Sequence, residues 1–261
     1  MFGAERTFEG VNTMKIGAQF FTIRDFCKTP KDLAESLKKV ADIGYTTVQI
    51  SGTCAYDPEW LDKELRKNGL ECVITHIPAD RIANEPETVA KQHDIFGCKY
   101  VGLGHFGFDL TQESLQKFKD TFLPAAKVLK EHGKYFMYHN HNGEFRRIDG
   151  KLILAHLMEE IPAEYMGFTF DTYWAQVGGA DPAEWLERLA GRIPCIHLKD
   201  CAYGQQMAVI GEGNINFDRV FQMAEAGGTE YMLVEQDDCN GENPFDCLKR
   251  SYDYLTACGF H

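Results

Sequence analysis

Several patterns that would assign this sequence to a common class are absent from it. Its nine cysteines form no Cys-x-x-Cys pair, and there is no Pro/Gly/Ser-rich linker. No apolar run approaches the roughly 20 residues of a membrane helix, and the N-terminal MFGAERTFEG has no signal-peptide core. We therefore predict a cytoplasmic protein with one domain over residues 1–261, in which residues 1–13 are a flexible or capping segment. Because the cysteine count is odd and several lie in apolar runs such as ECVIT, buried thiols are expected rather than disulfides.

Positive charge is also scarce. The chain has 27 Lys and Arg against 39 Asp and Glu, a formal net charge of −12. Such a surface would repel a phosphate backbone or an anionic membrane, so neither nucleic acid nor membrane is an expected partner. A small neutral or cationic ligand remains compatible with this balance, and homo-oligomerisation is left open.

Short runs rich in β-branched and aromatic residues alternate with longer amphipathic segments along the whole chain. This alternation is typical of strand–helix units. The runs expected to be strands are 15–21, 46–51, 71–76, 100–104, 134–140, 165–171, 193–200 and 231–236. The segments expected to be helices are 29–44, 57–69, 111–133, 181–191, 216–228 and 244–259.

Eight strand–helix units in about 250 residues match the size of a closed (β/α)8 TIM barrel, an α/β fold. The alternative is an open doubly wound sheet, which would need a glycine-rich phosphate turn after an early strand. AQFFTIRD (18–25) offers none, and GHFGFD and GEGN lack the dinucleotide spacing. The sequence therefore favours the barrel.

The carboxyl ends of the expected strands are much richer in histidine and acid than the strand bodies. Catalytic groups of TIM barrels come from these ends. Side chains alternate in a strand, so Asp171, His197, Glu235 and His139 are predicted to point inwards while their apolar neighbours point outwards. Four consecutive strands, the fifth to the eighth, would thus direct polar groups to one point on the axis.

The acidic and imidazole groups near these ends form a candidate metal site. Glu144, Asp171, His197 and Glu235 offer three carboxylates and one imidazole. This set suits Mn²⁺, Mg²⁺ or Co²⁺ better than a closed thiolate zinc site. Each residue alone has a plainer explanation: Asp171 could cap the next helix, and His197 could be a hydrogen-bonded core residue.

Further polar residues at the strand ends are candidates for substrate binding. For the histidines the alternatives are packing or, for the two that precede Glu144, orienting that glutamate. Lys199 could instead pair with Asp200 or Asp171. The candidates are Gln19, His76, His105, His139, His141 and Lys199.

The same motifs carry a resemblance to a known family. YHNHNGEF, FTFDTYWAQVGGADPAEWLERLAGRIPCIHLKD and YMLVEQD, with KIGAQFFTIRD and IGYTTVQISG near the start, resemble the xylose isomerase-like TIM-barrel superfamily. Within it the chain is similar to the sugar phosphate isomerase/epimerase group, which is related to inosose dehydratase and the ketose 3-epimerases. DNA-repair endonucleases share the superfamily, but they need more metal-binding histidines and a basic face.

The resemblance implies one divalent metal, commonly Mn²⁺ with Zn²⁺ among the alternatives, bound by Glu144, Asp171, His197 and Glu235. The epimerases place their first glutamate at the strand end, where this chain has His139, so either Glu144 or His139 would be the fifth-strand ligand.

The function expected from the site and the resemblance is a metal-dependent isomerase or epimerase of a sugar, keto-sugar or cyclitol. Glu144 and Glu235 would be the catalytic residues, transferring a proton through a metal-stabilised enediolate. One alternative is a lyase or dehydratase acting on a keto-sugar, an inosose or a 3-keto-glycoside. The other is a non-catalytic sugar-binding barrel.

Overall fold

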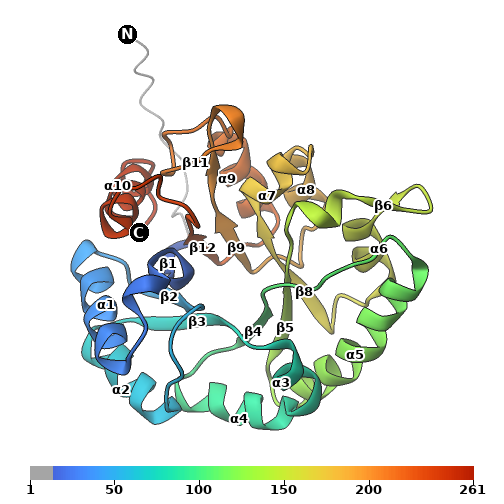
Figure 1. The fold of residues 1–261 in the computed structure, drawn as a ribbon, viewed down its shortest axis with the longest axis horizontal. Coiled ribbons are helices and arrows are strands. Elements are labelled where there is room, and N and C mark those ends of the chain that lie inside the picture. The colour runs from blue at the N-terminus through green and yellow to red at the C-terminus, as the bar shows by residue number, and fades with distance from the viewer. Residues whose placement is uncertain (1–13) are drawn as a thin grey trace.

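The computed structural model describes residues 14–261, so the expectation for residues 1–13 lies outside the described part. Eight parallel strands close into a barrel in the order β1-β2-β3-β4-β5-β8-β9-β12 (Figure 1). This confirms the predicted (β/α)8 fold. The strands are β1 Lys15–Gln19, β2 Thr47–Ile50, β3 Glu71–His76, β4 Tyr100–Leu103, β5 Tyr135–His139, β8 Met166–Asp171, β9 Cys195–Leu198 and β12 Tyr231–Val234.

Helices surround the barrel as an outer layer (Figure 1). The six expected helices are present, and four others, α3, α4, α6 and α7, lie outside the expected segments. The helices are α1 Pro30–Ile43, α2 Pro58–Lys67, α3 Ala79–Asn84, α4 Pro86–Ile95, α5 Gln112–Glu131, α6 Ile153–Glu160, α7 Thr172–Val177, α8 Pro182–Arg188, α9 Phe217–Ala226 and α10 Pro244–Ala257. No helix in residues 14–261 is both long enough and apolar enough to span a bilayer.

Several helices begin with the same local chemistry. A capping side chain is followed by proline at the first helical position, where the missing N–H would be unpaired in any case. Asp57, Asp181 and Asn243 accept backbone N–H hydrogen bonds in this way, and Thr29 forms a full capping box with Asp32. These caps fix where each helix leaves its loop, and hence where the loops around the barrel mouth lie.

Side chains of the strands divide into two cores, as the alternation predicts. One set fills the barrel interior and includes Met137, Cys195 and Leu233. The other packs between strands and helices and includes Phe136 and Phe170. Because the phase holds to the strand ends, the polar residue that closes a strand in the inward phase must face the axis.

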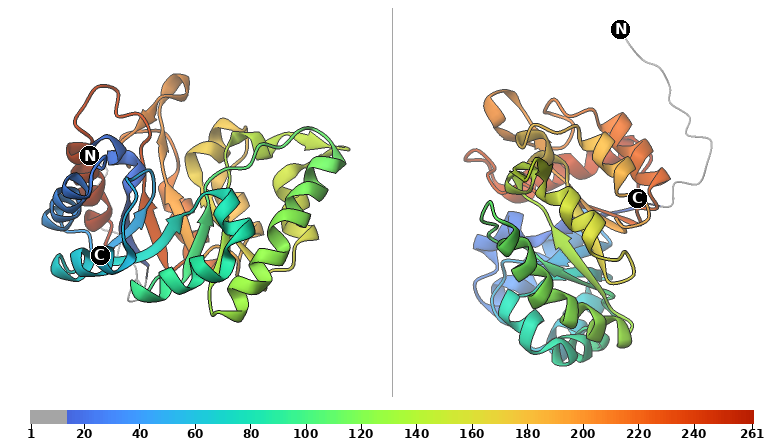
Figure 2. Two further views of the ribbon diagram at one scale, coloured as in Figure 1. Left: turned by 60° about the horizontal axis from the view of Figure 1, so that its bottom comes forward. Right: turned by 90° about the vertical axis from the view of Figure 1, so that its right-hand side faces the viewer.

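Short irregular elements cover the carboxyl end of the barrel. They are the 3-10 turns η1 Phe20–Phe26, η2 Asn142–Phe145 and η3 Tyr203–Gln205, and the hairpins β6 Arg147–Ile148 with β7 Lys151–Leu152 and β10 Asp200–Cys201 with β11 Met207–Ala208. The β10–β11 hairpin projects from the barrel (Figure 2). Asp200 anchors its loop, because Oδ2 accepts from the backbone N–H groups of Gly211 at 3.0 Å and Gly213 at 2.9 Å.

Candidate metal centre

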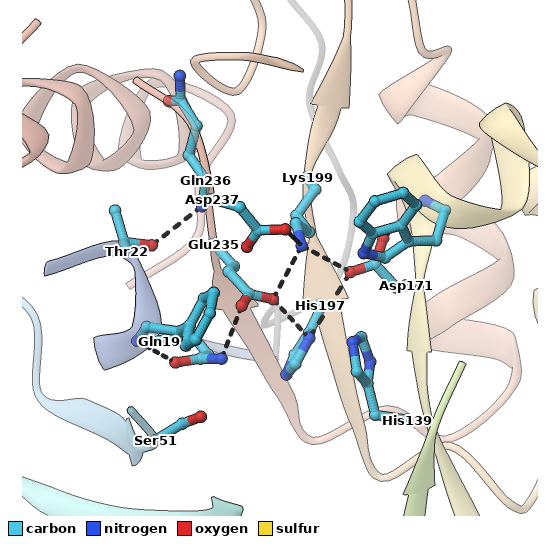
Figure 3. Close-up of polar contacts among 12 residues, drawn as sticks. Gln19, Thr22, Ser51, His139, Asp171, His197, Lys199, Glu235, Gln236 and Asp237 are labelled. Carbon is cyan, nitrogen blue, oxygen red and sulfur yellow. Dashed lines mark hydrogen bonds and ion pairs between the residues drawn. The ribbon is translucent and has the colours of Figure 1, made fainter. Parts of the chain in front are cut away.

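Four buried side chains from successive strand ends meet at the carboxyl end of the barrel. His139 closes β5, Asp171 closes β8, His197 lies on β9, and Glu235 follows β12. Their ligand-type atoms all lie within 4.8 Å of one another. Figure 3 shows Asp171, His197 and Glu235 directed towards a common centre, with His139 beside them.

Strand register explains why these residues meet. In the parallel pairing, Asp171 lies opposite His197, and His139 lies opposite Thr169, two residues before Asp171. Glu235 continues the β12 ladder by donating its backbone N–H to the carbonyl of Leu198 at 3.1 Å. Residues at matching heights on adjacent parallel strands project inwards together, so the site is built from rigid elements.

His197 is held with one ring nitrogen directed at the two carboxylates. Its Nε2 lies 2.6 Å from Gln49 Oε1, and an amide oxygen only accepts, so Nε2 carries the proton and donates. Nδ1 is then the nitrogen that faces the carboxylates, 2.9 Å from Glu235 Oε2 and 3.7 Å from Asp171 Oδ2, and it offers a lone pair once its own proton is lost. A polar group that fixes the far nitrogen is the usual support of a metal-bound histidine.

The donor atoms at this centre fit a divalent cation. His197 Nδ1, Asp171 Oδ2 and Glu235 Oε2 are all buried and none has a hydrogen-bond partner, although Lys199 Nζ lies within ion-pair distance of both oxygens. Buried polar atoms are rarely left unpaired, and such atoms call for a missing ion or water. Two imidazoles and two carboxylates are ligand types that bind Mn²⁺, Fe²⁺, Co²⁺ or Zn²⁺. The cluster is therefore a candidate site for a divalent metal.

Charges inside the cluster shift the protonation of its members. Burial lowers the pKa of His197, but Glu235 and Asp171 outweigh it and raise that pKa to about 9. Burial raises the pKa of Glu235, but Lys199 and His197 outweigh it and hold that pKa well below its usual range. Burial, together with the neighbouring His197, holds the pKa of His139 well below its usual range. In the metal-free protein the centre thus pairs a protonated His197 with ionised Glu235 and neutral His139.

Asp171 combines the two roles considered from sequence. Its Oδ1 accepts the backbone N–H of Trp174 at 2.9 Å and caps α7. Its own backbone N–H donates to Asn140 Oδ1 at 3.1 Å. The second carboxylate oxygen, Oδ2, is left for the cluster. One oxygen thus fixes the carboxylate while the other faces the centre.

Lys199 neutralises the acidic side of the site. Its Nζ lies 2.8 Å from Asp237 Oδ2, 3.3 Å from Glu235 Oε2 and 3.5 Å from Asp171 Oδ2 (Figure 3). Of the two ion pairs considered from sequence, the structure shows the one between Lys199 and Asp171. The carboxylate of Asp200 instead accepts hydrogen bonds from backbone N–H groups. The side chain is only 1% exposed, so its charge acts on the carboxylates without much screening.

Glu144 lies outside the four-residue cluster, which differs from its expected place in the metal set. Its Oε1 accepts from the Tyr138 hydroxyl at 2.5 Å, and its Oε2 accepts from the backbone N–H of His141 at 2.8 Å. Both oxygens are used by residues that precede η2, Tyr138 on β5 and His141 at the N-cap of the turn. The fifth strand instead contributes His139 to the cluster, which is the other alternative that the sequence leaves open.

A cavity of about 420 Å³ opens beside the cluster. It brings together all six residues expected to bind substrate, along with Glu235 and two polar residues that the sequence did not single out, Ser51 and Asp237. The six are Gln19, His76, His105, His139, His141 and Lys199. Gln19 Nε2 donates to Glu235 Oε1 at 2.8 Å, so Gln19 also orients the glutamate. Asp237 lies in the inward phase two residues after Glu235, which is the pattern that could have identified it.

Comparison with known proteins agrees with this fold. The family model for the xylose isomerase-like TIM barrel matches residues 37–258. The chain belongs to this family. Its relatives include an inosose dehydratase from Geobacillus kaustophilus, 25% identical over 86% of this chain and 87% of that protein.

Solved structures share this architecture. A sugar phosphate isomerase/epimerase from Parabacteroides distasonis superposes with a TM-score of 0.81 at 21% identity, covering 98% of both chains. An L-ribulose 3-epimerase superposes with a TM-score of 0.75 at 16% identity, covering 94% of both chains. At these identities the likeness concerns the fold. The relatives are enzymes of more than one reaction class, so the reaction has to be argued from the residues of this chain.

Proposed function

We propose that this member of the xylose isomerase-like family is a metal-dependent lyase that eliminates an oxygen substituent β to the carbonyl of a keto-sugar or keto-cyclitol. The observation that carries this proposal is the single glutamate of the cavity. Among the described residues lining it, Glu235 is the only glutamate. Glu144 does not line the cavity, and both of its carboxylate oxygens accept hydrogen bonds from Tyr138 and His141. The inosose dehydratase relative supports the same reaction class.

The four-residue cluster supplies the electrophilic part of the site. A divalent cation held by His139, Asp171, His197 and Glu235 would polarise the substrate carbonyl and acidify the neighbouring C–H bond. Lys199 contributes positive charge and the cavity histidines contribute ring N–H donors around the same position. The burial of Lys199 and His139 strengthens their electrostatic contacts, because little water competes for them.

Glu235 is assigned the proton transfer. The lowered pKa keeps its carboxylate ionised, and Gln19 holds Oε1 in a fixed direction at 2.8 Å. The carboxylate takes the proton from the carbon next to the carbonyl. The electron pair of that C–H bond forms a C=C bond as the β C–O bond breaks, and the proton passes to the departing oxygen. Atoms and charge balance with water or an alcohol as the second product.

Epimerisation or isomerisation is the second candidate. It requires that the proton be returned to carbon from another direction, so a second proton-transfer group must face Glu235. His105 and His141 line the cavity, with ring centroids 5.3 Å apart, and they are the residues that favour this reading. The catalytic pair would then be a glutamate and a histidine rather than Glu144 and Glu235.

Product analysis tests the proposal. Metal-loaded protein is incubated in D₂O with an inosose and with 3-keto-glucose, and products are followed by mass spectrometry and by enone absorbance. We expect loss of the mass of water and a new enone. Conserved mass with one deuterium incorporated would assign the protein to the epimerases, and no turnover or exchange would indicate a sugar-binding barrel.

Two matched variants connect the chemistry to the residue. Glu235→Gln is expected to abolish elimination, because the amide cannot accept the proton. Glu144→Gln is the control, since it makes the same chemical change beside the cavity and is expected to retain turnover. Equal loss in both variants would contradict the assignment to Glu235.

A further inference from the structure

A second cavity lies next to the first one. It has a volume of about 450 Å³ and is formed by the loops after β2 and β3 together with α4. The two cavities share four lining residues, Ser51, His76, Ile77 and Pro78. A keto-sugar or keto-cyclitol at the metal cluster fills only the first cavity. The elimination of water therefore leaves the second cavity without an occupant.

The lining of the second cavity differs in chemistry from that of the first. Tyr56 and Phe96 present two rings, 6.5 Å apart between centroids and nearly perpendicular at 78°. No carboxylate lines it, and Arg81 is the only residue among its lining with a fixed charge. The first cavity, in contrast, carries Glu235 and Asp237. The second cavity therefore suits an aromatic group with a polar or weakly acidic hydroxyl.

His76 stands at the shared wall. Its Nδ1 lies 3.1 Å from Ser51 Oγ, and its buried Nε2 has no hydrogen-bond partner. Its ring centroid is 5.4 Å from that of His139 and 5.7 Å from that of His197. A buried imidazole nitrogen without a partner indicates a ligand atom that completes it. The position between the cluster and the second cavity is where the oxygen joining two halves of a substrate would lie.

We propose that the second cavity holds the leaving group of the elimination, so that the substrate is a keto-glycoside with an aromatic aglycone. This inference rests on the proposed lyase function and specifies its substrate class. The glycosidic C–O bond breaks as the C=C bond forms, and the proton taken by Glu235 goes to the aglycone oxygen. The products are an unsaturated keto-sugar and a phenol, with no change in overall oxidation state. His76 Nε2 donates a hydrogen bond to the departing oxygen.

A filling variant tests this assignment. Ala55 lines the second cavity and is exposed, so Ala55→Trp should occupy the cavity without disturbing the core. The matched control is Ala163→Trp, which places the same ring at an exposed alanine in a cavity at the amino end of the barrel. The substrates compared are the 3-keto derivative of 4-nitrophenyl glucoside and an inosose, which has no aglycone.

We expect Ala55→Trp to lower kcat/KM for the aryl substrate by about tenfold or more, a difference of about 1.4 kcal/mol, and to change that for the inosose by less than about twofold. Ala163→Trp should change neither. If Ala55→Trp affects both substrates equally, or neither, the second cavity does not hold the leaving group, although the lyase function would still stand.

A binding measurement distinguishes failure of the aromatic-site inference from failure of the proposed lyase function. Titration calorimetry compares 4-nitrophenyl glucoside with methyl glucoside, neither of which can be eliminated. We expect the wild type to prefer the aryl compound by about tenfold and Ala55→Trp to lose that preference. If no substrate is eliminated, the proposed function fails, and this measurement alone decides whether the cavity binds an aromatic group.

Discussion

His197 Nδ1 and Glu235 Oε2 lie 2.9 Å apart, and neither atom has a hydrogen-bond partner outside this pair. The Nε2 proton of His197 is directed the other way, to Gln49 Oε1 at 2.6 Å. The close pair is therefore either bridged by a proton on Nδ1 or separated by a bound cation. Proton and metal compete for the same nitrogen.

This competition predicts that metal affinity depends on pH. The raised pKa of His197, about 9, means that the metal-free protein holds a proton on Nδ1 at neutral pH, which metal must displace. Glu235 is ionised and His139 neutral in this range, so neither adds a proton. We expect the affinity for Mn²⁺ to rise about tenfold per pH unit between pH 6.5 and 8.5, with release of about one proton. Calorimetry in buffers of different ionisation enthalpy measures both quantities. An affinity that does not change with pH would contradict this account.

The identity of the fifth-strand ligand gives a second prediction. His139→Gln should lower the affinity for Mn²⁺ by about tenfold or more, because the cluster loses an imidazole donor. Glu144→Gln should leave the affinity within about threefold and instead reduce the free energy of unfolding by about 1–3 kcal/mol, because an amide N–H₂ replaces one acceptor for Tyr138 or His141. Metal content by mass spectrometry and urea unfolding distinguish the two. The opposite pattern would make Glu144 the ligand.

Gly102 on β4 and Gly104, the residue just after that strand, give a third prediction, on the position of His76. A Cβ on Gly104 would lie 2.9 Å from His76 Nδ1, whereas a Cβ on Gly102 would lie 2.5 Å from the backbone oxygen of Thr75. A side chain can turn away, but a strand backbone cannot. We expect Gly104→Ala to displace the His76 ring at a cost within about 1 kcal/mol, and Gly102→Ala to cost roughly 3 kcal/mol. Urea unfolding measures the change in the free energy of unfolding, and the NMR signals of His76 report whether its ring has moved. Equal costs would mean that His76 is as fixed as the backbone.

The sequence was sufficient to predict the eight strands and the inward phase of their polar ends. Both follow from alternation, which burial enforces along each strand, and this is why Asp171, His197 and Glu235 could be placed before the structure was known. Glu144 was harder to place, because its position depends on a 3-10 turn whose hydrogen bonds run to the Tyr138 hydroxyl and one backbone N–H. Such short-range contacts leave no periodic pattern in the sequence. Residue spacing therefore could not decide whether Glu144 or His139 is the fifth-strand metal ligand.

Other features depend on contacts between distant segments. Gln49 supports His197 across 148 positions of the chain, and the second cavity forms only where two loops and α4 come together. Of the four unpredicted helices, α3 and α4 are separated only by Glu85. A sequence window long enough to detect the helical period of apolar residues spans both helices. The apolar patterns of α3 and α4 therefore overlap within it.

His93 gives a fourth prediction, on stability. Its Nδ1 lies 2.8 Å from the Val89 carbonyl and its Nε2 2.7 Å from the Thr75 hydroxyl, both consistent with a neutral ring. Burial lowers its pKa to about 4, against 6.5 when unfolded. A depressed histidine pKa stabilises the fold above pH 6.5, and that stability is lost as pH falls towards 4, because the unfolded chain binds the proton more readily. The loss amounts to roughly 3 kcal/mol, at about 1.4 kcal/mol per pKa unit.

Urea unfolding of the metal-free protein between pH 7 and 4.5 checks this. His76 and His141 also have pKa values lowered by burial, to about 3 and about 4, so they add slopes of the same sign. The informative quantity is therefore the difference between wild type and His93→Gln. The variant should have a lower free energy of unfolding at pH 7. On acidification that free energy should fall less steeply than in the wild type, because unfolding of the variant takes up about one proton fewer. If the two slopes are equal, His93 does not titrate between the folded and unfolded states as its contacts require.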